Sequence, residues 1–191
     1  RQMGLPDPGV SRNKSQPAKS LKTHLSPANQ TLMIRGDNDR FDISLDMSGP
    51  PLFKRGLKQQ VIQAPLRETL AFAMLNRLKF CADDTLVDPM CGSGTFSLEG
   101  ALIQSMVPPG FFRSFAFEKW PGFQPRRFAH ARDRISQAIC PLSSPAIHAS
   151  DLDQRAVEAL RSAISGHEIL ERISVNCQDF FDLTPPPSSS G

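Results

Sequence analysis

The chain has 191 residues, of which 39% are hydrophobic and 21% are charged, a balance that suits a soluble globular domain and part of a second one. No apolar run approaches the roughly 18 residues that a membrane helix requires, and no leader typical of secretion is visible, so we expect no membrane partner. The chain begins with Arg1 and ends in a Pro- and Ser-rich stretch, so we expect it to be a piece of a longer protein.

Charge is unevenly distributed along the chain. Residues 1–80 hold 13 Lys or Arg against 6 Asp or Glu, whereas residues 81–191 hold 9 against 13. A basic first part is consistent with a polyanionic partner, and equally with a solvated loop that carries surplus lysine.

The four cysteines do not form a metal or disulfide framework. Cys81, Cys91, Cys140 and Cys177 include no Cys-x-x-Cys pair, and no histidine lies at a zinc-binding spacing from them. We therefore expect no metal and a reducing, cytoplasmic location.

The first third of the chain predicts a β-hairpin between two loops. Residues 1–30 are rich in Pro, Ser, Lys and Asn and predict a flexible lead-in. Residues 31–36 and 40–47 flank an Asp-Asn-Asp turn, and the alternation of Phe41, Ile43, Leu45 and Met47 predicts one buried face. Residues 48–58 predict a linker.

Strands and helices alternate in the rest of the chain. A helix should begin near Pro65, with Leu66, Leu70, Ala73 and Met74 as its apolar stripe. Further helices are predicted at 96–106, 125–139 and 154–165, and strands at 85–88, 146–150 and 173–177. This order predicts an α/β fold with a parallel sheet.

The strongest chemical motif is Asp88-Pro-Met-Cys-Gly-Ser-Gly-Thr95, which leaves a strand and opens a helix. Gly92 and Gly94 allow a tight turn and a close backbone approach to a ligand, and free N–H groups at a helix start favour a carboxylate or phosphate. The pattern is not a P-loop, because no Gly-Lys-Ser/Thr follows. It is not the dinucleotide Gly-x-Gly-x-x-Gly either, because position 97 is Ser, and this disfavours a nicotinamide-dependent oxidoreductase.

Acidic residues follow the next two predicted strands. Asp151 suits the hydroxyls of a ribose, whereas Asp153 suits a helix N-cap. Asp179 can accept a hydrogen bond from an exocyclic amine, and Phe180 can flank an aromatic base. Each acid taken singly could also be an ordinary turn residue.

These stretches resemble the THUMP-associated RNA methylases, class I S-adenosylmethionine-dependent enzymes, and in particular the bacterial 23S rRNA guanine-N2 methyltransferases. Besides residues 88–95, the resemblance rests on Ser44–Gly49 with Lys54–Gly56, on Ala64–Leu70 and on Phe115–Trp120. It implies a Rossmann-like methyltransferase fold at residues 59–191, here with the first three strands. Residues 1–58 would then be the end of a THUMP-type RNA-binding region.

The resemblance also implies a binding site for S-adenosylmethionine. The family's glycine motif falls on Asp88, Pro89, Cys91, Gly92, Ser93, Gly94 and Thr95, its ribose acid on Asp151, and its adenine contacts on Asp179 and Phe180. Leu66 and Thr69, near the start of the preceding helix, would face the methionine end of the cofactor.

The family's catalytic signature, Asn/Asp-Pro-Pro-aromatic, does not occur in the sequence; Pro185–Pro187 lacks both the preceding amide or acid and the aromatic residue. We therefore assign no catalytic residue and expect the chain to carry the cofactor half of the site. The rest of the methyltransferase domain, or a second chain, would be its partner, together with RNA, of which rRNA fits the resemblance best.

Two alternatives stay open: a tRNA or DNA base methyltransferase, and a catalytically inactive RNA-binding or assembly paralogue.

The helix predicted at 125–139 carries four arginines that could contact phosphate or form a solvated face: Arg126, Arg127, Arg132 and Arg134.

Overall fold

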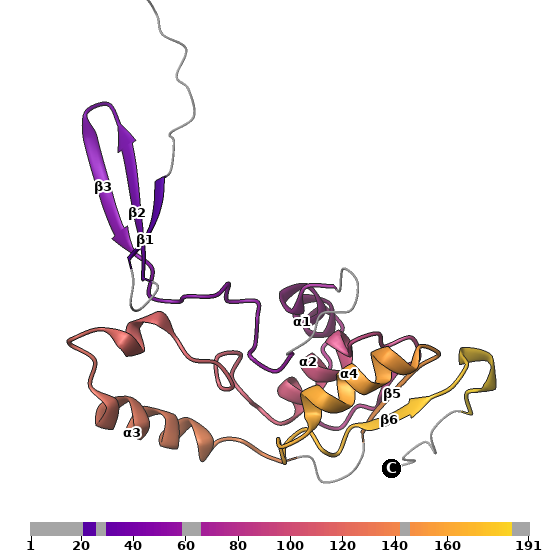
Figure 1. The fold of residues 1–191 in the computed structure, drawn as a ribbon. Coiled ribbons are helices and arrows are strands. Elements are labelled where there is room, and N and C mark those ends of the chain that lie inside the picture. The colour runs from indigo at the N-terminus through magenta and orange to yellow at the C-terminus, as the bar shows by residue number, and fades with distance from the viewer. Residues whose placement is uncertain (1–20, 26–29, 59–65, 142–145, 185–191) are drawn as a thin grey trace, which may run out of the picture. The chain divides into compact units, whose positions relative to one another are not determined.

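The computed structural model describes residues 21–25, 30–58, 66–141 and 146–184, with the side chains of residues 21–25 excepted. The chain divides into two compact units between Met47 and Ser48 (Figure 1).

The first unit is a three-stranded antiparallel sheet in the order β1-β2-β3. Its strands are β1 (Leu21–Leu25), β2 (Gln30–Asp37) and β3 (Arg40–Leu45). β2 and β3 are the predicted hairpin, and Asn38 and Asp39 turn it with positive φ angles of 46° and 59°. The expectation of a loop throughout residues 1–30 is wrong at β1, which pairs with β2 from Leu21 opposite Ile34 to Leu25 opposite Gln30.

The predicted burial of one hairpin face is also wrong for the described residues. Phe41 and Ile43 are 70% and 67% exposed, and Leu45 and Met47 are exposed as well. Alternation in sequence places these side chains on one face of β3, but alternation does not supply a second layer to cover that face.

The second unit contains a parallel sheet in the order β4-β5-β6, as the alternation of elements predicts. The strands are β4 (Leu86–Asp88), β5 (Ile147–Asp151) and β6 (Ser174–Cys177). The α-helices are α1 (Glu68–Arg77), α2 (Thr95–Gln104), α3 (Pro125–Ser136) and α4 (Gln154–Ile164), and the 3-10 turns are η1 (Ala116–Lys119) and η2 (Phe180–Asp182). This is a Rossmann-like fold, in which parallel strands are joined by helical crossovers.

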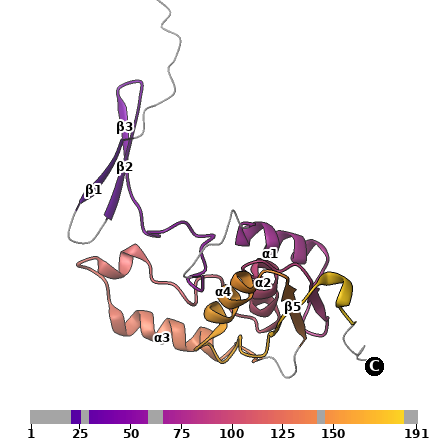
Figure 2. The same cartoon turned by 45° about the vertical axis from the view of Figure 1, so that its right-hand side comes forward.

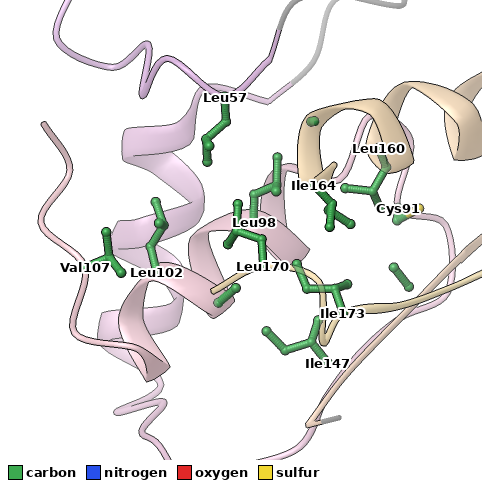
Figure 3. Close-up of a cluster of buried hydrophobic side chains, with 13 residues drawn as sticks. Leu57, Cys91, Leu98, Leu102, Val107, Ile147, Leu160, Ile164, Leu170 and Ile173 are labelled. Atoms are coloured by element: carbon green, nitrogen blue, oxygen red, sulfur yellow. The ribbon is translucent and has the colours of Figure 1, made fainter. Parts of the chain in front are cut away.

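The core of the second unit lies between the sheet and helices α2 and α4. Figure 3 shows Leu98 and Leu102 of α2, Leu160 and Ile164 of α4, and Ile147 of β5 gathered in one cluster. Gly100 lies on α2 where a Cβ atom would stand 2.7 Å from Leu86 Cδ2, so the helix can approach β4 closely only without a side chain at this position.

Helix α1 begins later than predicted and buries a different face. Its N-cap is Arg67, and Pro65 lies outside the described residues. The buried residues are Ala71 and Leu75, whereas Leu70 and Met74, predicted in the apolar stripe, are each 48% exposed.

Residues 48–58, predicted as a linker, pack as an integral part of the second unit. The buried Arg113 guanidinium donates to four carbonyl oxygens of this segment, those of Ser48, Pro50, Pro51 and Lys54, at 2.5–3.1 Å. Arg55 forms a buried two-point ion pair with Glu99 of α2, with Nε–Oε1 and Nη2–Oε2 distances of 2.8 and 3.0 Å. These charges fix the segment against α2.

Breaking the Arg55–Glu99 pair should destabilise the second unit. Removing one partner leaves the other charge buried and uncompensated, so Arg55→Met or Glu99→Gln should each lower the unfolding free energy by about 3–5 kcal/mol. Arg55→Met combined with Glu99→Leu should recover most of this loss, because neither charge then remains. Urea unfolding followed by circular dichroism measures both effects.

The exposed Arg155–Asp153 pair provides the control. Arg155→Gln should shift the unfolding midpoint far less than either buried replacement. Equal shifts for the exposed and buried pairs would contradict the stabilising role of the buried Arg55–Glu99 ion pair.

Candidate functional site

The segment from Asp88 to Thr95 forms a loop across the carboxyl ends of β4 and β5. The Cys91 N–H donates to Ser150 O at 2.9 Å, and the Gly94 N–H donates back to Cys91 O at 2.8 Å. The Ser150 hydroxyl donates to Pro89 O at 3.4 Å. The loop is thereby attached to β5 and ends at the start of α2, as the sequence predicts.

Two glycines in this loop have different structural roles. Both have positive φ, 53° at Gly92 and 74° at Gly94. A Cβ atom on Gly94 would stand 2.3 Å from Leu160 Cδ1, so this glycine allows the loop to pack on α4. A Cβ atom on Gly92 would meet nothing within 4 Å, so Gly92 presents bare backbone to open space.

Asp151, at the end of β5, joins two loops through one carboxylate. Its Oδ2 accepts from the Gly92 N–H at 2.8 Å, and its Oδ1 accepts from the Asp153 N–H at 2.9 Å. Asp153 itself caps α4 by accepting from the Arg155 N–H at 3.0 Å. The N-cap predicted for Asp153 is confirmed, whereas Asp151 lies at the glycine loop and its contact with a ribose stays a prediction.

Asp88 lies half-buried at the end of β4. Its Oδ2 accepts from the Ser97 hydroxyl at 2.6 Å. Burial raises the pKa of the Asp88 carboxyl above its ordinary value and Asp151 adds to the rise, while the Ser97 hydrogen bonds and the Lys58 ammonium act against it. Asp88 fixes the first turn of α2 rather than facing solvent.

The loop has features that suit the cofactor implied by the resemblance. Gly92 leaves room for a ligand to touch the backbone, and the buried Ser93 Oγ has no hydrogen-bond partner among the described atoms. A buried hydroxyl without a partner is costly unless a ligand or water satisfies it. Asp151 beside Gly92 supplies a carboxylate that can accept from ribose hydroxyls.

Asp179 and Phe180 follow β6 at the same edge of the sheet. β6 pairs with β5, and the Gln178 N–H donates to Asp151 O at 3.1 Å, which brings this segment beside Asp151. Asp179 caps η2 by accepting from the Phe181 N–H at 3.0 Å, and the Phe180 ring is 48% exposed. Their predicted contact with adenine remains a prediction.

Leu66 lies next to the motif, because its carbonyl accepts from the Thr95 hydroxyl at 3.4 Å. Thr69 lies on the first turn of α1 and is exposed, and within the described part of the chain no hydrogen bond joins it to the loop. The structure thus brings ten of the predicted residues, Asp88, Pro89, Cys91, Gly92, Ser93, Gly94, Thr95, Asp151, Asp179 and Leu66, into one hydrogen-bonded neighbourhood or its immediate edge.

Lys58 is a candidate site residue that the sequence motifs do not predict. Its Nζ donates to Thr95 Oγ1 at 2.5 Å and lies 3.9 Å from Glu68 Oε1, with its side chain almost fully buried. Burial lowers the pKa of the Lys58 ammonium, and the carboxylates of Glu68, Glu99 and Asp88 oppose this. Only a contact between residues 37 apart in sequence reveals this lysine, and no local pattern points to it.

Within the described ranges, no helix has the length and apolar character needed to cross a bilayer. The same part of the chain holds no group of three or more His, Cys, Asp or Glu side chains that could bind a metal ion.

The two glycines should respond differently to alanine. Gly92→Ala should cost about 1 kcal/mol, since a Cβ at positive φ is strained even in open space. Gly94→Ala should cost roughly 1–3 kcal/mol more, because its Cβ must displace Leu160. Urea unfolding of the two variants side by side measures the difference, and equal losses would contradict the close packing of the loop on α4.

Cys91 should resist alkylation. Burial, with the Asp88 and Asp151 carboxylates nearby, raises the pKa of the Cys91 thiol to about 12, whereas Cys81, Cys140 and Cys177 are exposed. Because the thiolate is the reactive form, iodoacetamide at neutral pH should label three cysteines in the folded chain and the fourth only in denaturant. Peptide mass spectrometry locates the label; prompt labelling of Cys91 in the folded chain would contradict the observed packing.

Comparison with known proteins identifies the family. The RMKL-like methyltransferase domain profile matches residues 55–191. The chain is 34% identical over 160 residues to the ribosomal RNA large subunit methyltransferase K/L of Shewanella baltica, and 35% identical over 158 residues to that of Methylococcus capsulatus. These alignments cover 80% and 78% of the chain but only 22% and 21% of the relatives, so the chain spans about a fifth of their length.

Solved structures of methyltransferases are also similar to this chain. A putative methyltransferase, SMU.472, determined as a complex with SAH, superposes with a TM-score of 0.70 at 30% identity. A predicted N6-adenine-specific DNA methylase from Listeria monocytogenes also gives a TM-score of 0.70, at 29% identity. Each superposition covers 81% of this chain and 40% of the other. The fold, the glycine loop and the profile match agree, and the chain belongs to the RMKL-like methyltransferase domain family.

Proposed function

We propose that the chain carries the cofactor-binding part of an S-adenosylmethionine-dependent RNA methyltransferase, with guanine N2 of 23S rRNA as the target. The observation that carries the proposal is the loop at Gly92, where bare backbone faces open space beside the Asp151 carboxylate. The related proteins named as ribosomal RNA methyltransferases favour RNA over DNA as the substrate class, and the relative solved with SAH supports the choice of cofactor.

S-adenosylmethionine, when bound, supplies an electrophilic methyl group on a sulfonium centre. The chain's own residues would hold it: the glycine loop and Ser93 at the methionine end, Asp151 at the ribose, and Asp179 with Phe180 at the adenine. Leu66 and Thr69 complete the proposed set near the start of α1. Orientation of this kind matters because the exocyclic amine of guanine is a poor nucleophile and must be held in line with the methyl group to react.

The proposed cofactor-binding residues do not include a catalytic group. The groups that accept from the target amine and stack on the base would come from the rest of the methyltransferase domain or from a second chain. Within the described sheet, β4 and β6 each pair on one side only, so a further strand could extend the sheet. A cytoplasmic location is part of the proposal and is supported by the four free cysteines.

Replacement of Asp151 should weaken binding of S-adenosylhomocysteine. A hydrogen bond to a charged group contributes about 1.5–3 kcal/mol, so Asp151→Asn should raise the dissociation constant roughly ten- to a hundredfold. Isothermal titration calorimetry of the chain with S-adenosylhomocysteine measures the effect.

Asp153→Asn is the matched control for this experiment. It removes a carboxylate two residues away, while the amide can still cap α4. It should leave affinity within about twofold, and circular dichroism should show both variants folded. Absence of binding by the folded parent chain, or equal loss in both variants, would refute the proposed site.

A further inference from the structure

Helix α3 is a strongly basic element at the periphery of the second unit. Its residues, 125–136, contain four arginines and one histidine against a single aspartate. None of them is buried, and both views place the helix away from the sheet and its covering helices (Figures 1 and 2). A helix of this length is marginal alone in water, so the contacts of one face must hold it.

That anchoring face is formed by Phe128 and Arg132. The Phe128 ring packs against Phe117 and Phe123, with centroids 5.4 and 5.5 Å apart. Arg132 donates from Nη2 to the Phe111 carbonyl at 2.8 Å and stacks over the rings of Phe111 and Phe128. Arg132 is thus used within the fold, which removes it from the set of candidate phosphate contacts.

The remaining basic side chains lie together on the opposite side of the helix. At 3.6 residues per turn, Arg126, Arg127, His130 and Arg134 fall within about 100° of one another around the axis. All four side chains are exposed. Arg127 donates to Gln124 Oε1 at 3.2 Å, and no acidic partner for Arg126 or Arg134 occurs among the described residues.

The two arginines of α4 have partners within this unit. On α4, Arg155 pairs with Asp153 at 3.0 Å, and Arg161 donates to Val175 O at 2.8 Å. Residues 48–191 as a whole are almost neutral, with 15 Lys or Arg against 14 Asp or Glu. The positive charge on α3 is therefore a local concentration of like charges, which costs folding free energy unless an anion neutralises it.

We propose that the outer face of α3, formed by Arg126, Arg127, His130 and Arg134, binds the phosphate backbone of the RNA substrate. Arg126 and Arg134 are separated by about 12 Å along the helix axis, enough to contact more than one phosphate. Arginine is suited to this role because its guanidinium donates to phosphate oxygens in pairs. Such contacts position an RNA without reading its sequence, so the face would orient the substrate while other parts choose the base. The inference rests on the proposed function, since it takes RNA as the substrate.

The test is fluorescence anisotropy of the chain with a labelled RNA stem-loop over a range of potassium chloride concentrations. The variant Arg126→Gln, Arg127→Gln, Arg134→Gln removes the three charges and leaves Phe128 and Arg132 in place. At low salt it should bind at least tenfold more weakly. Its plot of log affinity against log salt should be shallower by about two to three, because each lost phosphate contact removes close to one unit of slope.

The variant Arg77→Gln, Lys79→Gln, Arg161→Gln is the control, with the same loss of charge at exposed positions on α1, just after it, and on α4. It should retain affinity within about threefold. Unchanged RNA binding by the α3 variant, or an equal loss in the control, would overturn the proposal.

Calorimetry with S-adenosylhomocysteine on the same samples separates the two proposals. Cofactor binding retained in the parent together with no effect of the α3 variant on RNA would overturn the α3 interface alone. If the folded parent chain does not bind S-adenosylhomocysteine, the proposed function is overturned instead.

Discussion

The site depends on a contact that permits no side chain. Gly94 lies so close to Leu160 that the loop after β4 can rest on α4 only because this residue lacks a Cβ atom. Gly92, two residues earlier in the loop, donates its N–H to the Asp151 carboxylate, which fixes the loop to the end of β5. This approach lets the loop lie on α4 and across the end of β5, while the parallel pairing of β4, β5 and β6 brings the three strand ends to one edge of the sheet.

Buried charge attaches a further segment to this framework. Arg113 satisfies four carbonyl oxygens of residues 48–54, and the Arg55–Glu99 pair fixes the end of that segment to α2. Lys58 follows directly and reaches Thr95, the last residue of the motif. Because these contacts are directional and buried, we interpret them as positioning the segment beside the candidate site.

The two surfaces proposed for the second unit differ in physical character. The glycine loop is compact, largely buried and held by backbone hydrogen bonds, which suits recognition of a small cofactor. The outer face of α3 is exposed, and its arginines have no acidic partner among the described residues, on a helix anchored by aromatic rings; this suits a long polyanion. The proposed function requires both, since an RNA methyltransferase must hold cofactor and substrate at once.

The sequence by itself determined the alternating strands and helices, the glycine loop and the acids at the strand ends, because these depend on local periodicity and on residues close together in the chain. It missed β1, whose five residues lie in a polar stretch, and it placed the wrong face of α1 inside, since Leu70 and Met74 are exposed while Ala71 and Leu75 are buried. Only the tertiary structure decided these points, along with the roles of Arg55, Lys58 and Arg132. Contacts such as Arg55 with Glu99, 44 residues apart, arise from packing between elements, and no local pattern encodes which partner a side chain will meet.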